Sequence, residues 1–332
     1  MAANLKQHHH MAPRWLFDPV KGNVVREPLA SGEGHWVGAP GVFSDEEAIY
    51  LTYRYRQPRD QGRGVESRIA RSVDGVHFED IWHVPQSALE TSSVERFALD
   101  KTPEGYVLYL SFVDPVDNRW RTDRVIAPRP DQFRVHQREP LFTAAPLNVA
   151  AVKDPVLVHA HGLSWMFLST AVVSLSGLER TEEELHASQD VYTTGLVSST
   201  TGLAVSRDGL HYQWLGHVLE PSPQHWDAYA SRISTVFATS HGFIAFYDGG
   251  ASVQENYEER TGVAVSADLV HWTKLSVDGP WLVSPYGKGT LRYIDYVIWN
   301  RQAFLYYEMA RPDGSHELRV IVLPQDEKGA QG

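Results

Sequence analysis

The chain has 332 residues, of which 42% are hydrophobic, and a formal net charge of −11 at pH 7. This acidity argues against nucleic acid as the main partner, because a phosphate backbone requires a basic face. The chain has no cysteine, which excludes disulfides, thiolate metal sites and cysteine nucleophiles. It also lacks the long apolar run of a membrane span, of about eighteen residues or more, so no membrane partner is expected.

The first residues are set apart from the rest of the chain. His8, His9, His10 and Met11 resemble an expression tag, and the charged-then-apolar order of a secretory signal is missing. We predict a tag or disordered leader over 1–11, one domain over 12–325 and a disordered tail over 326–332. A cytoplasmic location is the default expectation, and secretion stays open if a leader has been replaced.

One phrase of eleven residues occurs three times, as Arg68–Phe78, Gly202–Tyr212 and Gly262–Trp272. Each copy joins a strand of small residues to a Ser-x-Asp turn and then to an aromatic residue. Arg124–Phe133 is a degenerate fourth copy. Internal repetition of this kind is typical of propellers and other repeat folds. We predict an all-β, five-bladed β-propeller, with a β-sandwich or two small β domains as the alternative.

The segments between these turns predict the blades. Five runs rich in β-branched and aromatic residues have the pattern of second strands: Ala48–Arg54, Tyr106–Phe112, Leu163–Leu168, Gly242–Tyr247 and Ala303–Glu308. A short helical insertion is predicted in blade three, at Leu175–Leu196, with Thr181 as N-cap and Glu184 three residues later. The fifth blade shows three strands, and we expect Pro13–Val25 to add the fourth and so remove a free edge.

The repeats resemble those of the five-bladed propeller glycosidases, the superfamily of glycoside hydrolase families 43, 32, 117 and 130. Lys153–Leu157 and Thr261–Trp272 strengthen a likeness that runs from Trp36 to Leu323. The resemblance implies a substrate funnel at the starts of the innermost strands, where acidic residues do the chemistry. Many family 43 enzymes have an Asp-Pro pair at the first start, which supplies the general base. This chain has Ala39 and Pro40 there.

Four residues near these starts are the candidate catalytic groups. Glycosyl cleavage usually needs two carboxyl groups, one protonated and one ionised. Glu95 is the expected acid, because burial raises a carboxyl pKa, and Asp154 is the expected base or tunes its partner. Glu308 is expected to reach the same mouth. His35 is a candidate base in place of the missing aspartate. The alternative is that Glu95 and Asp154 only form structural pairs with Arg96 and Lys153 or with backbone turns.

Cations and aromatic residues complete the predicted site. Arginine recognises carboxylates and phosphates in a planar, bidentate way, so Arg96, Lys153, Arg232 and Arg292 suggest an anionic ligand such as a uronic acid. Neutralisation of local acids is the alternative. Further substrate-binding candidates are Tyr293, Asp248, Trp36, His225 and Trp226. Tyr257 is a further stacking candidate, in an acidic stretch, Gln254–Glu259, that is either a solvated loop or a rim of the site. No cofactor or catalytic metal is expected, and a structural calcium ion, present in several relatives of this family, stays open.

The leading functional hypothesis is a glycoside hydrolase-like enzyme that cleaves a small glycoside or oligosaccharide by carboxylate acid/base chemistry. The missing first-blade aspartate also allows a repurposed lyase, phosphorylase or cyclase. A non-catalytic carbohydrate-binding propeller is the third possibility. The fold does not decide among them, because function belongs to the site. The oligomeric state is not predicted.

Overall fold

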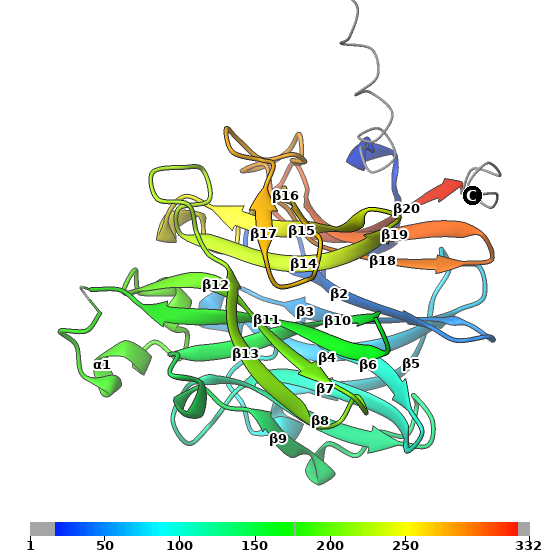
Figure 1. Ribbon diagram of the computed structural model, residues 1–332, viewed down its shortest axis with the longest axis horizontal. Helices are drawn as coiled ribbons and strands as arrows, with labels where there is room; N and C mark the ends of the chain where they lie inside the picture. Colours follow the sequence, from blue (N-terminus) through cyan, green and yellow to red (C-terminus); the bar gives the residue numbers. More distant parts are fainter. Residues whose placement is uncertain (1–16, 176, 325–332) are drawn as a thin grey trace, which may run out of the picture.

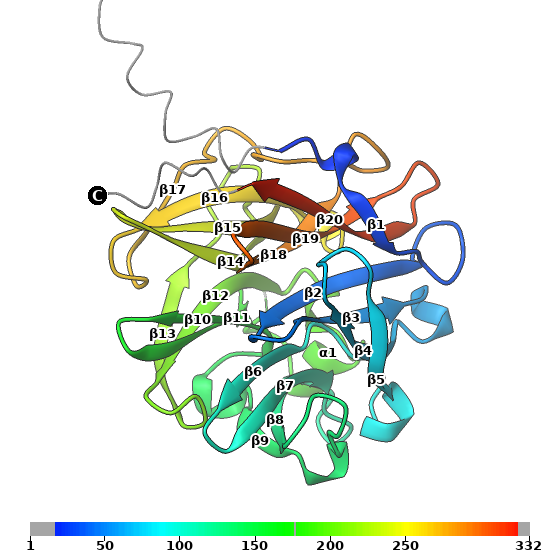
Figure 2. The same ribbon diagram turned by 90° about the vertical axis from the view of Figure 1, so that its right-hand side faces the viewer.

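The computed structural model describes residues 17–175 and 177–324, and in this part the chain forms five antiparallel blades around one axis. Figure 2 shows the blades around a common centre, and Figure 1 shows the same body from the side. The predicted all-β, five-bladed propeller is therefore confirmed. The expected tag and tail lie outside the described residues, and the domain bounds 12 and 325 stay predictions.

Every blade has four strands, counted from the axis outward. Blade 1 contains β2 (Trp36–Ser44), β3 (Ile49–Arg56), β4 (Gly64–Ser72) and β5 (Glu79–Pro85). Blade 2 contains β6 (Ala98–Thr102), β7 (Gly105–Val113), β8 (Trp120–Ala127) and β9 (Glu139–Phe142). Blade 3 contains β10 (Ala151–Ala160), β11 (Leu163–Val173), β12 (Val197–Ser206) and β13 (Tyr212–Leu219). Blade 4 contains β14 (Ala230–Thr239), β15 (Gly242–Gly250), β16 (Arg260–Ser266) and β17 (Trp272–Lys274).

Both ends of the described chain build blade 5. It contains β18 (Leu291–Trp299), β19 (Gln302–Ala310), β20 (His316–Pro324) and, as the outer strand, β1 (Asn23–Arg26). β1 pairs with β20 in antiparallel fashion, Asn23 opposite Val320. This confirms that the N-terminal segment supplies the fourth strand, and it covers an edge that β20 would otherwise leave unpaired.

The helical insertion of blade 3 is also confirmed. α1 (Glu182–His186) begins after Thr181, whose side chain accepts from the backbone of Glu184 while the Glu184 side chain accepts from the backbone of Thr181. The insertion projects at the left of Figure 1. Within the described residues, no helix is long and apolar enough to cross a membrane. Short 3₁₀ turns are η2 (Pro19–Lys21), η3 (Arg59–Gln61), η4 (Gln86–Leu89), η5 (Val135–Gln137), η6 (Ala145–Leu147), η7 (Val191–Thr193) and η8 (Val253–Glu255).

The apolar core lies between the blades. One cluster of buried side chains fills each of the five interfaces between neighbouring blades, and a further one, around Trp120, packs under the insertion. The innermost strands β2, β6, β10, β14 and β18 contact one another in a closed ring. Burial of apolar surface therefore holds the blades together and leaves the axis for polar groups.

The repeated phrase forms the same hydrogen-bonded turn each time. In the first copy the Ser72 hydroxyl accepts from Gly75 N at 2.8 Å, and Asp74 accepts from the backbone of His77 at 2.8 Å. Gly75 has φ of +78°, a left-handed conformation that favours glycine, and the third copy places Leu269 there at +69°. The histidine side chain is exposed and lies 2.7 Å from Asp74. His77, His211 and His271 therefore belong to peripheral turns, and they bond the turn aspartate rather than pack.

Arg96 crosses the axis from the start of blade 2. Its Nη1 donates to the carbonyl of Ser234 in blade 4, and its Nη2 donates to Asp295 in blade 5, each at 2.8 Å. Asp295 also accepts from Val42 N of blade 1 at 2.9 Å. One buried guanidinium therefore joins blades on opposite sides of the axis.

Replacing Arg96 by Met is expected to lower the free energy of unfolding by about 3 kcal/mol, because it leaves the Asp295 carboxylate without its cation. Urea titration measures the change. Arg129→Met is the control, since the Arg129–Asp131 pair is exposed, and it should lower the free energy of unfolding far less than Arg96→Met does. Equal losses in the two variants would show that Arg96 does not hold the blades together.

Candidate functional site

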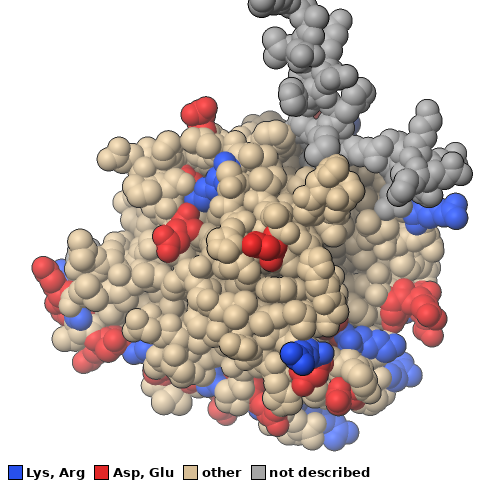
Figure 3. Space-filling view, viewed as in Figure 1, with Lys and Arg blue, Asp and Glu red and all other residues tan. Residues whose placement is uncertain are grey.

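A cluster of buried charges surrounds the starts of the inner strands. Six side chains form an alternating chain of ion pairs across four blades, in the order Glu95, Arg54, Glu308, Arg292, Glu259, Arg232. Each of them is at most 6% exposed. On the surface drawn in Figure 3, by contrast, acidic and basic side chains are interspersed along the lower edge. A set of paired charges therefore lies inside the propeller, away from the surface.

The ion pairs link residues far apart in the sequence. Arg54, on β3, contacts Glu95 and also Glu308, with Nη2 3.6 Å from Oε2. Arg292, on β18, contacts Glu308 at 2.8 Å and Glu259 at 2.6 Å. Arg232, on β14, also contacts Glu259. The two arginines of blades 4 and 5 are thus ion-paired with local acids, which supports the neutralising role for these two residues.

Blade 3 adds Lys153 and Asp154. The Lys153 ammonium lies 2.8 Å from Asp154 and 3.8 Å from Glu95. Asp154 and Tyr293 both have positive φ, +57° and +54°, at bulges where the pairing of the inner strand shifts. A bulge inserts an extra residue into a strand and so changes the direction in which a side chain points. The Tyr293 hydroxyl consequently lies 3.5 Å from Asp154 Oδ2.

Tyr293 also contacts Asp248, at the end of β15. Its backbone N–H donates to both Asp248 oxygens, at 3.0 and 3.2 Å. Tyr293 therefore fixes two carboxyl groups from neighbouring blades, Asp154 through its hydroxyl and Asp248 through its backbone.

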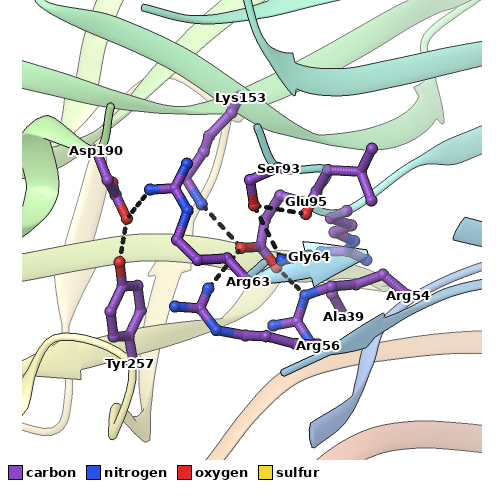
Figure 4. A network of polar contacts seen from close by, with 12 residues as sticks. Ala39, Arg54, Arg56, Arg63, Gly64, Ser93, Glu95, Lys153, Asp190 and Tyr257 are labelled. Carbon is purple, nitrogen blue, oxygen red and sulfur yellow. Dashed lines mark hydrogen bonds and ion pairs between the residues drawn. The ribbon is translucent and has the colours of Figure 1, made fainter. Parts of the chain in front are cut away.

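Aromatic and polar side chains from three loops cover the cluster (Figure 4). The Arg56 guanidinium lies over the rings of Trp36 and Tyr257, at 5.0 and 4.0 Å. The Tyr257 hydroxyl donates to Asp190 of the insertion, whose other oxygen accepts from Trp120 Nε1 at 3.1 Å. Arg63, from the β3–β4 loop, lies 3.4 Å from Asp190. The stretch around Tyr257 is thus a rim of the site, one of the two readings that its sequence allowed.

The carboxyl groups differ in pKa. Burial opposes ionisation of Glu95, but Arg54, Lys153 and Arg56 outweigh it and lower its pKa to about 2. Arg232 and Arg292 likewise overcome burial and lower the pKa of Glu259 to about 2. For Asp248, burial wins over the attraction of Arg232 and raises the pKa to about 7.

The expectation of a raised pKa for Glu95 is therefore wrong. Its partners come from blades 1 and 3, and three cations stabilise the charged form more than burial destabilises it. The pKa of Glu308 is also held well below its usual range, because Arg292, Arg54 and His316 offset the effect of burial. Asp248, predicted only as a binding residue, has instead the raised pKa that suits a proton donor near neutral pH.

Several predicted residues lie apart from the cluster. The Arg96 guanidinium points to Ser234 and Asp295, although its backbone N–H donates to Asp154 at 3.2 Å. His225 is exposed in the β13–β14 loop. The Trp226 ring stacks on Tyr247 within blade 4, so the expected role of Trp226 as a sugar platform at the funnel is corrected.

His35 and Trp36 lie beside the cluster. His35 is half-buried, and its Nδ1 is a buried atom without a hydrogen-bond partner. Trp36 stacks on His316, with 4.4 Å between the ring centres. His316 in turn lies 2.8 Å from Glu308. The role of His35 as a base stays a prediction.

Sequence reasoning missed Arg54, Arg56, Asp190 and His316. Arg54 and Arg56 alternate with apolar residues on a strand whose residues are all buried. Arginine is seldom fully buried unless it is paired, so two arginines at this spacing were the available signal. Among the described residues, no group of three or more histidine, aspartate or glutamate side chains is arranged to hold a metal ion.

No protein-family model and no curated protein sequence matches the chain. Solved structures do match its fold. A glycosyl hydrolase from Bacteroides ovatus is 16% identical with a TM-score of 0.58, covering 94% of this chain and 95% of that one. A thermostable family 43 glycoside hydrolase is 13% identical with a TM-score of 0.62, covering 92% and 94%.

A third solved structure is described with the family 130 mannoside phosphorylases, a family that contains glycoside hydrolases targeting β-1,2 mannosidic linkages in Candida mannan. It is 16% identical with a TM-score of 0.57 and covers 96% of this chain and 97% of that one. At such identities the likeness shows the fold: the chain has the five-bladed propeller of these glycosidases.

Asp248→Asn and Glu95→Gln are expected to change the pH dependence of stability in opposite ways. The folded pKa of Asp248, about 7, lies above its ordinary 3.8, so the wild type loses stability as pH rises from about 4 to 7. Asp248→Asn removes this loss, and its stability relative to the wild type should increase across that window.

The ionisation of Glu95 changes stability with pH in the opposite direction. Its pKa of about 2 lies below the ordinary 4.5, so its stabilising charge is fully present above about 4.5 and is lost as pH falls toward 2. Glu95→Gln should be less stable than the wild type at neutral pH, and the gap should narrow on acidification. Urea unfolding of the wild type and the two variants between pH 3 and 8 measures both differences in stability. Parallel stability curves for the two variants would contradict the pKa assignment.

Proposed function

We propose that the chain is an enzyme of the glycosidase type that cleaves a glycosyl bond of a small glycoside in the axial cluster. The observation that carries the proposal is the separation of carboxyl pKa values within one site: Asp248 near 7, and Glu95 and Glu259 near 2. Carboxyl groups whose surroundings drive their pKa values apart are suited to acid and base roles.

In this proposal Asp248 is the proton donor and Asp154 is the second carboxyl group of the pair. Asp154 lies 2.8 Å from the Lys153 ammonium, which fixes its position. Tyr293 contacts both groups and so keeps their relative position constant. Fixed placement of acid and base relative to the scissile bond is what such chemistry requires.

Glu308 has a different role in the proposal. Ala39 stands where family 43 enzymes often carry the base, and the Glu308 carboxylate fills this place from β19, accepting from Ala39 N at 3.1 Å. Because Arg292, Arg54 and His316 hold its pKa well below the usual range, Glu308 is a poor proton acceptor. Its charge is placed instead to stabilise the positive character of a glycosyl transition state.

A turnover screen on aryl glycosides and oligosaccharides, with and without phosphate, tests the proposal. Asp248→Asn and Asp154→Asn should each lower kcat by about 100-fold or more. Wild-type kcat should fall as pH rises through about 7, where Asp248 loses its proton, and this limb should be missing in Asp248→Asn.

Asp74→Asn, in a peripheral turn, is the matched control and should keep full kcat. Full activity of Asp248→Asn would contradict the assignment of the acid. Dependence on phosphate would indicate phosphorolysis. Sugar binding without turnover would favour the non-catalytic carbohydrate-binding alternative.

A further inference from the structure

Two arginines of blade 1 have donors that the protein leaves unused. Arg54 and Arg56 are two residues apart on β3, so their side chains leave the strand on the same face. They are 0% and 2% exposed. The Nη1 atom of each is buried without a hydrogen-bond acceptor. A buried N–H group without an acceptor is unfavourable. A ligand that placed oxygen atoms beside these two nitrogen atoms would remove this cost.

The charge around Glu95 leads to the same conclusion. Arg54, Arg56 and Lys153 all converge on this one carboxylate, as Figure 4 shows. Arg54 and Lys153 have second carboxylate partners. Among the described residues Arg56 has only Glu95, with Nη1 3.6 Å from Oε2. Arg56 is therefore the cation of the cluster that is least neutralised.

The surroundings of Arg56 fix its plane. Its guanidinium lies over the rings of Trp36 and Tyr257, whose centres are 6.0 Å apart, so both rings contact it and restrict its orientation. A planar guanidinium held in this way matches the paired oxygens of a carboxylate or phosphate.

We propose that Arg54 and Arg56 form an oxyanion subsite, and that the substrate is an anionic glycoside whose carboxylate binds there. The proposal rests on the proposed function of the same cluster and names its substrate class. A phosphate group presents the same oxygens and is the other source of such an anion. Arg232 and Arg292, the arginines suggested by the sequence, lie within 2.8 Å of Glu259 or Glu308, so they are more closely neutralised than Arg56, whose carboxylate contact is 3.6 Å long.

Tyr257 controls access to this subsite. It is partly exposed, whereas Trp36 is 4% exposed, so a ligand would reach Arg56 from the Tyr257 side. Tyr257 has φ of +81° and is held by its hydrogen bond to Asp190. An incoming sugar therefore breaks this bond and takes the place of the Tyr257 ring over Arg56.

Matched sugar pairs test the proposal by calorimetry, without any need for turnover. Methyl glucuronide and methyl galacturonide are compared with methyl glucoside and methyl galactoside, so that each pair differs at one carboxylate. The uronides should bind the wild type about tenfold or more tightly than their neutral partners. Arg56→Met should remove this preference, and Arg56→Lys should restore part of it.

Arg68→Met is the control variant. Arg68 is also on blade 1, lies over the Tyr55 ring and is paired with Glu66 and Asp80, but on β4 away from the axis. It should keep the full preference for uronides. Thermal unfolding of each variant confirms that it is folded, and the wild-type comparison stands even if Arg56→Met does not fold.

Equal binding of acidic and neutral sugars by the wild type, or no binding of any of them or of phosphate, would overturn the subsite. So would a preference that persists in folded Arg56→Met. Binding of inorganic phosphate alone that depends on Arg56 would keep the subsite and assign it to a phosphate. Uronide binding without turnover would overturn the proposed catalysis alone, and turnover without uronide preference would overturn the subsite alone.

Discussion

The burial of charge at the axis is the constraint on which the rest of the structure depends. An isolated carboxylate in a protein interior is strongly unfavourable, and it is tolerated when paired with cations and hydrogen-bonded. Glu95, Glu259 and Glu308 each contact two or more cations, and these partners come from other strands and mostly from other blades. The charges can therefore be accommodated only when the ring of blades closes, which the apolar clusters between blades and the β1–β20 pairing achieve.

The same constraint explains why one carboxyl group behaves differently. Arg232 is the direct cross-strand partner of Asp248, but its guanidinium is engaged by Glu259. Asp248 is left with the backbone N–H of Tyr293 and a buried position, which raises its pKa to about 7. A titratable group near neutrality thus arises because a neighbouring acid takes the nearest cation, and not because Asp248 itself is unusual in sequence.

Local chemistry made much of the fold predictable. Ser72 and Asp74 form a turn that depends only on neighbouring residues, so its repetition at Ser206 and Ser266 revealed the blades. The capping box at Thr181 was readable for the same reason. The residues at the starts of the inner strands could also be predicted, because the repeat determines which residues come first in each blade.

The pKa values and side-chain directions that depend on residues distant in the sequence could not be predicted. The pKa of Glu95 is set by Arg54 and Lys153, and the direction of Arg96 by Ser234 and Asp295, which lie 138 and 199 residues further along the chain. Arg54 and Arg56 were not predicted because they lie on the second strand of their blade, whereas the expected funnel is at the start of the first strand. Trp226 looked like a sugar platform because its packing against Tyr247 leaves no trace in the local sequence.

The small residues at the first-blade start show how the site departs from the glycosidase pattern. A Cβ atom on Gly38 would lie 2.2 Å from the Glu308 carboxylate, and the neighbouring Ala39 donates its N–H to the same carboxylate. An aspartate at Ala39 would therefore bring a second negative charge against Glu308. The Glu308 carboxylate lies against this position from β19, where Arg54, Arg292 and His316 hold it ionised. In the function that we propose, proton transfer is therefore assigned to the two carboxyl groups that Tyr293 joins, Asp248 and Asp154.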